Sequence, residues 1–217
     1  VLSPGGVEGW WIPEYVAKKH PNLKTVKDVM ANPQQVGGRF NNCPDGWGCR
    51  IVNDNLVKAL KLEGSGLKVF NHGSGETLST SIASAYEDSK PWFGYYWGPT
   101  AVLGKYKMKK LSIGAIDVKV HTENQNKDAA NPGVSDFPPA PVLTVVTSAF
   151  KKREPAIAKL MSNVSFDVDV MNGLLAWKKD KGASAEEAAV RVLNTQKSTW
   201  SNWVSDGARK KLSAIIK

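Results

Sequence analysis

Apolar residues recur at helical spacing in two stretches of the first half of the chain. Within residues 50–61, Val52, Leu56 and Leu60 fall four positions apart, and residues 76–88 show a similar spacing. Side chains at such intervals share one face of a helix. Both stretches therefore predict amphipathic helices.

Three short apolar runs, each bounded by Gly, Pro or Asn, predict strands at residues 67–70, 92–97 and 106–111. Thr25 followed by Asp28 resembles a capping box, which indicates a shorter helix after Thr25. Strands that alternate with helices are typical of an α/β layered fold.

From residue 121 to residue 141 the apolar pattern gives way to Asn, Asp, Pro and Gly, a composition typical of a loop or linker. One β-like run follows at residues 142–147. Four helical patterns come after it, near residues 153–162, 167–180 and 185–194 and from residue 206. Ser184 and Glu187 form a capping box for the third of them.

The composition is that of an ordinary globular protein, with 41% hydrophobic and 23% charged residues. Its longest apolar stretches are far shorter than the roughly 20 residues that cross a bilayer. A net charge of +9 raises the possibility of a polyanionic partner. The excess is spread evenly, however, with 14 basic and 9 acidic residues in 1–110 against 15 and 11 in 111–217. Because nucleic-acid binders usually gather charge on one face, a basic nucleic-acid- or polyanion-binding module is kept only as the alternative function.

Cys43 and Cys49 enclose five residues, which include a proline and two glycines. This spacing suits a short disulfide loop and favours an oxidising compartment. Two thiols cannot complete a zinc shell, and the histidines lack paired ligand spacing, so neither a metal nor a cofactor is expected. The competing interpretation is a nucleophilic Cys49 with His72 or His121 as its base, which thiol titration would reveal.

Eight tryptophans are many for 217 residues, and most lie among Gly, Pro and polar neighbours. Trp47 lies between the two cysteines, directly before a predicted helix, and Trp97 ends a predicted strand at a turn. Converging aromatic faces attract a quaternary ammonium group, which cannot form hydrogen bonds, by about 0.5 to 2 kcal/mol per ring. The alternative is that these rings only pack against other side chains, as buried aromatic residues usually do.

A second feature lies beside Trp47. The backbone N–H groups of Gly48 and Cys49 precede the helix predicted at residues 50–61, and helix N-termini attract anions. Gly48 has no Cβ, so a carboxylate could approach its backbone closely. The ring and the amides together describe a zwitterion site. Residues 72–76 lack the full pattern of a phosphate-binding loop and are interpreted as a strand-to-helix turn that could face a ligand.

Four motifs resemble those of one family. They are Gly-Trp-Trp-Ile-Pro at residues 9–13, Asn-Cys-Pro-Asp-Gly-Trp-Gly-Cys at 42–49, Gly-Ser-Gly at 73–75 and Tyr-Tyr-Trp-Gly-Pro-Thr at 95–100. They are similar to motifs of the substrate-binding proteins of glycine betaine, proline betaine, carnitine and choline ABC importers. The resemblance covers essentially the whole chain. It implies an α/β type II periplasmic binding fold, whose two lobes close on a ligand, and it implies no catalysis.

The resemblance also implies roles for individual residues by matching motif. The set comprises cage walls at Trp47 and Trp97, carboxylate-holding amides at Gly48 and Cys49, a third wall at Trp10 or Trp11, and further candidate contacts at Tyr96 and His72. A small quaternary ammonium ligand and a membrane permease are the implied partners, and nucleic acid is not. The implied location is periplasmic or extracytoplasmic, with membrane anchoring through a preceding segment as an option.

The two lobes are expected at residues 1–120 and 142–217, with a crossover at residues 121–141. In such proteins a segment of roughly one hundred residues, an ordinary lobe size, precedes the Gly-Trp-Trp-Ile-Pro motif, whereas eight residues precede it here. We therefore expect the second lobe to be incomplete in this chain. Residues 142–147 would then be a buried-type strand without neighbours on both sides, and they should expose apolar surface.

Overall fold

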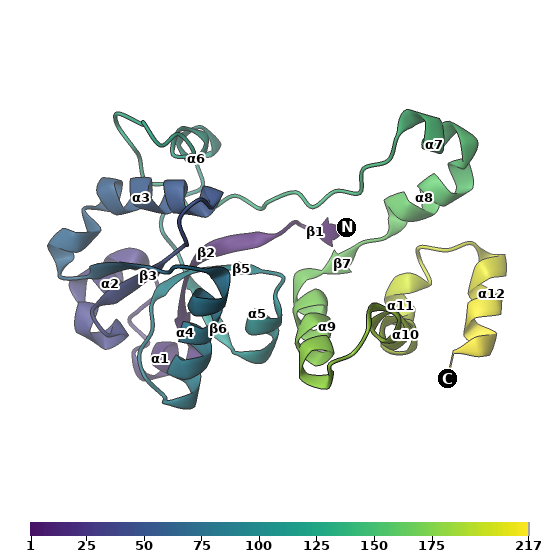
Figure 1. Cartoon of the computed structure of the whole chain (residues 1–217), viewed down its shortest axis with the longest axis horizontal. Coiled ribbons are helices and arrows are strands. Elements are labelled where there is room, and N and C mark those ends of the chain that lie inside the picture. Colours follow the sequence, from purple (N-terminus) through teal and green to yellow (C-terminus); the bar gives the residue numbers. More distant parts are fainter. Residues whose placement is uncertain (217) are drawn as a thin grey trace. The chain divides into compact units, whose positions relative to one another are not determined.

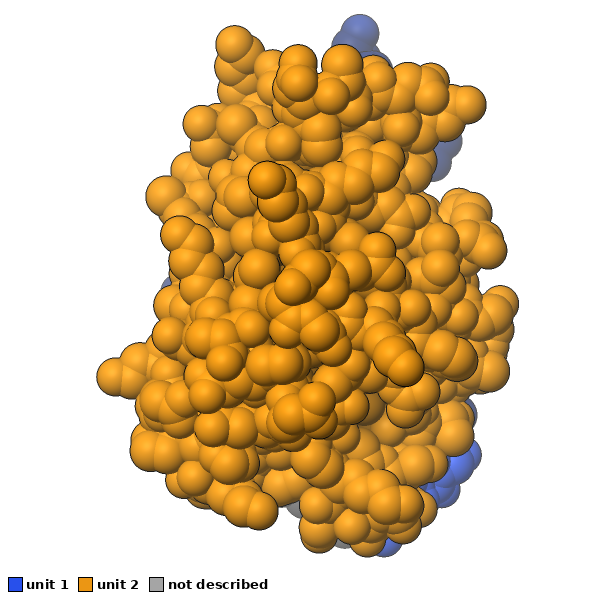
Figure 2. All heavy atoms as spheres, turned by 90° about the vertical axis from the view of Figure 1, so that its left-hand side faces the viewer, with its two compact units in different colours: residues 1–6, 99–104, 140–217 blue, residues 7–98, 105–139 orange. Residues whose placement is uncertain are grey.

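The computed structural model describes residues 1–216, which group into two compact units. Figure 2 colours the larger unit, residues 7–98 and 105–139, apart from the smaller unit, residues 1–6, 99–104 and 140–217. Residues 121–139, expected as part of a crossover, belong to the larger unit. The division into two functional lobes at residues 121–141 stays a prediction.

The larger unit is built on a five-stranded sheet. Its strands lie in the order β4 (Lys68–Asn71), β3 (Arg39–Asn42), β5 (Gly94–Gly98), β2 (Val7–Pro13) and β6 (Met108–Leu111). β3 is parallel to both of its neighbours, whereas β2 is antiparallel to both of its own. The three strands expected from apolar runs are confirmed, with shifted ends, as β4, β5 and β6.

The larger unit also contains helices. They are α1 (Glu14–Lys19), α2 (Val26–Ala31), α3 (Gly48–Leu60), α4 (Gly75–Glu87) and α6 (Val118–Glu123), with 3-10 turns at Pro33–Val36 and Leu62–Ser65. Figure 1 shows α3 and α4 on opposite sides of the sheet. Both were predicted from periodicity, and the capping box of Thr25 and Asp28 opens α2 as expected. α6 falls partly within the stretch that was expected to be a loop.

An aromatic cluster forms the core beneath α3. The ring of Trp10 is fully buried and lies 4.2 Å from that of Phe40 and 5.8 Å from that of Phe93, measured between centroids. Its indole N–H donates to Asn53 of α3 at 2.9 Å. A buried indole usually needs such a partner. The sheet and α3 are therefore joined by both packing and a hydrogen bond.

The smaller unit is mainly helical. Its helices are α5 (Ala101–Lys105), α7 (Ser148–Arg153), α8 (Pro155–Asn163), α9 (Val168–Lys181), α10 (Ala185–Thr195), α11 (Lys197–Trp200) and α12 (Asp206–Ile215); the last residue of α5 belongs to the larger unit. The smaller unit also contains a two-stranded parallel sheet of β1 (Leu2–Ser3) and β7 (Phe166–Asp167). The capping box of Ser184 and Glu187 is confirmed at α10. Among the described residues, no helix has the length and apolarity that a bilayer crossing requires.

The strand expected at residues 142–147 is wrong. These residues form neither helix nor strand. A strand needs neighbouring backbone to complete its hydrogen bonds. Here the carbonyl of Val142 accepts from the amino group of Val1 at 2.9 Å and that of Thr147 accepts from the N–H of Lys151 in α7 at 3.0 Å, and neither bond pairs the segment with a strand. Leu143 is 75% exposed and Val145 is 87% exposed, so the expectation of apolar surface in this segment is confirmed.

Candidate functional site

The cysteine loop, residues 43–49, connects β3 to α3 at the edge of the sheet where the parallel strands end. Cys43 and Cys49 form the predicted disulfide, with their Cα atoms 6.2 Å apart. Trp47 is the N-cap residue of α3 in an extended conformation and is 37% exposed. The disulfide and the start of the helix therefore restrict the loop on both sides of an accessible indole ring.

Trp97 approaches Trp47 from the end of β5. The two ring centroids are 5.2 Å apart and the ring planes meet at 75°. Tyr95 lies two positions before Trp97 on β5, and its ring is nearly parallel to that of Trp97 at 6.3 Å. The tryptophan pair, Trp47 and Trp97, therefore forms an aromatic corner within the larger unit.

The amides at the start of α3 lie next to this corner. In the described part of the chain, the N–H groups of Gly48 and Cys49 have no hydrogen-bond partner. Apart from Gly48 itself, its chain neighbours and the nearby backbone of α3, no described heavy atom lies within 4 Å of the point where a Cβ on Gly48 would be. α3 continues for 13 residues, so its N-terminus carries partial positive charge. The ring of Trp47 and a helix end with unpartnered amides thus lie side by side.

The start of α4 supports Trp47. A Cβ placed on Gly75 would lie 2.8 Å from Cη2 of the indole, closer than such atoms approach, so glycine is required for this contact. Ser74 caps α4 through a capping box with Thr77. Residues 72–76 are therefore the expected strand-to-helix turn, and Gly75 at its end lies against the ring of Trp47.

Neither of the two candidates for a third cage wall joins this pair. Trp10 lies in the core described above and is not accessible to a ligand. Glu8 is paired with Trp97 in the register of β2 and β5, so these two side chains lie on the same face of the sheet. Side chains alternate between the two faces of a strand, so Trp11, three positions after Glu8, points to the opposite face. The indole N–H of Trp11 donates to the carbonyl of Tyr96 at 2.9 Å. The structure thus gives Trp10 a packing role in the core and Trp11 a hydrogen bond within the sheet, and a third wall at Trp11 stays a prediction.

The two weaker candidates are both buried. Tyr96 is 3% exposed, and its ring stacks on Trp97 at 4.6 Å. His72 is 7% exposed, with Nε2 3.1 Å from Oδ1 of Asn41. Burial, with a smaller contribution from Arg39, lowers the pKa of His72 below its usual value. Burial therefore favours the neutral form of His72, whose ring is hydrogen-bonded to the side chain of Asn41 in β3.

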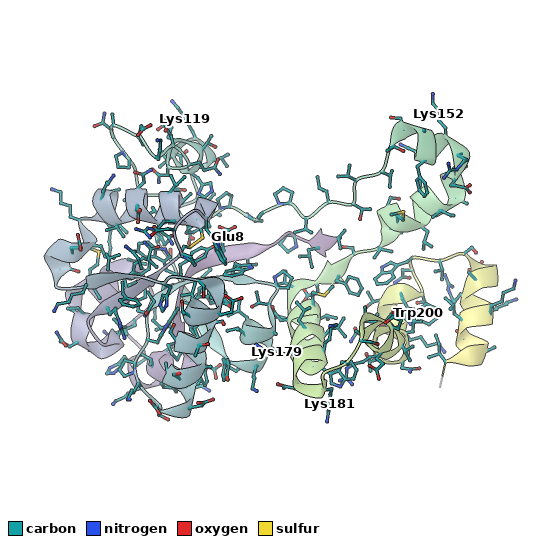
Figure 3. All side chains as sticks on the ribbon, in the orientation of Figure 1. Glu8, Lys119, Lys152, Lys179, Lys181 and Trp200 are labelled. Carbon is teal, nitrogen blue, oxygen red and sulfur yellow. A yellow bond between two sulfur atoms is a disulfide. The ribbon has the colours of Figure 1, made fainter. Side chains whose placement is uncertain are left out.

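Two polar groups near the pair were not singled out from the sequence. Glu8, labelled in Figure 3, is paired with Trp97 in the register of β2 and β5. Burial raises the pKa of Glu8, while Tyr95 and Lys110 oppose the shift. The second is Asn42, which is fully buried at the end of β3. The only signal in the sequence was the position of Asn42 directly before the cysteine loop.

The sheet and the site together define a class of protein. A mixed α/β sheet whose parallel strands end at an aromatic and helix-terminal site is typical of ligand-binding α/β proteins. The chain belongs to the OpuAC family, the substrate binding domain of ABC-type glycine betaine transport systems, whose model matches residues 1–194. This is a family of transport proteins and not of enzymes.

Individual relatives agree with this assignment. The chain is 24% identical to the glycine betaine/proline betaine-binding periplasmic protein of Escherichia coli strain K12 over 222 residues, which cover 95% of this chain and 66% of that protein. Its fold is similar to that of the glycine betaine, L-proline-binding protein of Borrelia burgdorferi, with a TM-score of 0.58 at 14% identity, over 96% of this chain and 69% of the other.

Lactococcal OpuAC, in a closed form with glycine betaine, gives a TM-score of 0.58 at 19% identity, over 93% of this chain and 68% of the other. A choline binding protein in complex with choline gives 0.56 at 17% identity, over 98% and 70%. The expected fold class, α/β of the type II periplasmic binding kind, is thereby confirmed. The chain spans about two-thirds of the length of these relatives.

Proposed function

We propose that this chain is the solute-binding component of an ABC importer and captures a small quaternary ammonium compound such as glycine betaine, proline betaine or choline. The observation that carries the proposal is the accessible corner of Trp47 and Trp97 next to the free amides of Gly48 and Cys49. Family membership and the names of the relatives point to the same ligands.

The chemistry of the site suits such a ligand. A trimethylammonium group offers no hydrogen-bond donor, so aromatic faces are its natural partners, at about 0.5 to 2 kcal/mol per ring. A carboxylate two bonds away would reach the amides of Gly48 and Cys49, where the helix dipole favours negative charge. A ligand with both groups therefore gains more from this site than choline does. Binding of this kind requires no cofactor and no bond cleavage.

Delivery to a membrane permease completes the proposed role. This role requires a location outside the cytoplasm, in the periplasm or on the external face of the cytoplasmic membrane, where a disulfide such as Cys43–Cys49 persists. We propose, as before, that residues 1–120 and 142–217 contribute to different lobes. The tryptophan pair and the amides all come from the first of these.

Calorimetric titration with glycine betaine tests the proposal. Trp47→Ala and Trp97→Ala should each weaken binding about tenfold, or about 1.4 kcal/mol, because each removes one aromatic wall. Trp177→Ala is the matched control, because this partly exposed ring packs under Arg191 at 4.5 Å in the smaller unit. Unchanged affinity in both site variants, with lowered stability, would instead support a packing role for the pair.

A further inference from the structure

Asn42 is the centre of a hydrogen-bond network that adjoins the cysteine loop. Its Oδ1 accepts from the backbone N–H of Cys43 and from Nδ2 of Asn53, each at 2.8 Å. Its Nδ2 donates to Oδ1 of Asp54 at 3.0 Å and to Oδ1 of Asn71 at 3.1 Å. A side-chain amide offers two donors and two acceptor positions. All four are used here, by a side chain that is fully buried.

These four bonds reach both loops that surround Trp47. The bond from Cys43 fixes the first residue of the cysteine loop. The bond to Asn71 holds the end of β4, which leads through the turn at residues 72–74 to Gly75, the residue in contact with the indole of Trp47. One side chain therefore sets the spacing between the loop that carries Trp47 and the turn that supports it.

The network also connects the site to the core. Asn53 accepts from the indole N–H of Trp10 at 2.9 Å and donates to Asn42, so its amide bridges the sheet core and the loop. Arg50 joins on the other side, through a two-oxygen contact with Asp54 at 2.8 and 2.9 Å. Its ion pair with Asp45 at 2.6 Å is a weaker restraint, because the Asp45 side chain is 89% exposed.

We propose that Asn42 is a positioning residue for ligand binding: it holds the cysteine loop and the turn before α4 at the spacing that orients the tryptophan pair. This role rests on the proposed function. Truncation of Asn42 would leave the N–H of Cys43 and the amide of Asn53 without their partner in a buried place. The loop would then keep its disulfide but lose its fixed relation to Gly75 and Trp97.

A matched control exists on α3. Asn55 is 1% exposed, like Asn42, and its Nδ2 donates to the carbonyls of Asn124 and Asn126 at 3.0 and 2.8 Å. Asn55→Ala therefore also removes buried hydrogen bonds, but between α3 and the loop after α6. It should destabilise the protein without disturbing the spacing of the two loops around Trp47.

The test measures near-ultraviolet circular dichroism without ligand, and affinity for glycine betaine at equal folded fraction. The signal of the pair is the difference between the wild type and Trp47→Phe. We expect Asn42→Ala to lose most of this signal and to bind about tenfold or more weakly, and Asn55→Ala to retain both. Equal losses in the two variants, or a retained signal in Asn42→Ala, would overturn the proposal.

A milder variant covers the case in which Asn42→Ala does not fold. Asn71 is exposed at the end of β4, so Asn71→Ala removes only the link to the turn before α4. We expect it to fold and to lose part of the dichroism signal, with about threefold weaker binding. An unchanged signal would contradict the role of the network. If the wild type binds no glycine betaine, the proposed function fails, while the dichroism still decides whether Asn42 orients the pair.

Discussion

Gly75→Ala separates binding from stability at the site. The new Cβ would lie 2.8 Å from Cη2 and 3.2 Å from Cζ2 of Trp47, whereas ordinary contact begins at 3.4 Å. Both atoms are at the far end of a side chain that is 37% exposed, so the ring can move away into solvent. The substitution should therefore displace one wall of the aromatic corner without damage to the core.

The two expected effects have opposite signs. Gly75 is the first residue of α4, and alanine is favoured over glycine in helices by up to about 1 kcal/mol. We expect the free energy of unfolding to stay constant or to rise within that limit. Affinity for glycine betaine should fall about threefold to tenfold, because part of the contribution of one ring is lost.

Urea unfolding and calorimetric titration of the same preparations measure both quantities. Gly173→Ala is the control, because Gly173 lies in α9 and the added Cβ would meet no described atom within 4 Å beyond its chain neighbours and the nearby backbone of the same helix. It should gain stability and keep affinity. If Gly75→Ala binds glycine betaine as tightly as the wild type does, then the position of the Trp47 ring does not determine affinity.

Three further predictions concern the rest of the chain. Thiol titration of the unfolded, unreduced protein should find no reactive thiol, because Cys43 and Cys49 are paired, and two thiols in fresh material would contradict this. Burial lowers the pKa of His72 below its ordinary value of 6.5, so its protonation opposes folding. The free energy of unfolding should therefore fall as the pH drops below 6.5, and this fall should be smaller in His72→Gln. The same pH dependence in the wild type and the variant would disprove this. Val145→Thr should change the free energy of unfolding by less than about 0.5 kcal/mol, because the side chain is 87% exposed; a larger loss in urea unfolding would show that Val145 is packed.

Several helices and the strands β4, β5 and β6 could be predicted because their signals are local. Periodicity predicted α3 and α4, and the capping boxes marked the starts of α2 and α10. The apolar run at residues 142–147 could not be placed in this way, since a strand depends on partners that are distant in the sequence. The amino acids of this segment favour a strand, but no strand of the described chain lies beside it to pair with.

The site could be predicted only where a motif fixes it. Trp47 and Trp97 lie together as the motifs suggested, whereas adjacent Trp10 and Trp11 point to opposite faces of a strand that is covered on both sides. Sequence alternation shows that they differ but not which one faces the core. The proposed role of Asn42 could not be predicted from the sequence either, because it depends on four hydrogen-bond partners that only the fold brings together.

We propose that the tryptophan pair recognises the positive charge of its ligand and not merely a trimethyl shape. The most direct measurement compares calorimetric titrations of the wild type with glycine betaine and with 3,3-dimethylbutanoate, which has the same shape and carboxylate but carbon in place of the charged nitrogen. We predict that the uncharged headgroup weakens binding about tenfold or more, because cation–π attraction to the two rings is lost. Equal affinity for the two compounds would contradict the account.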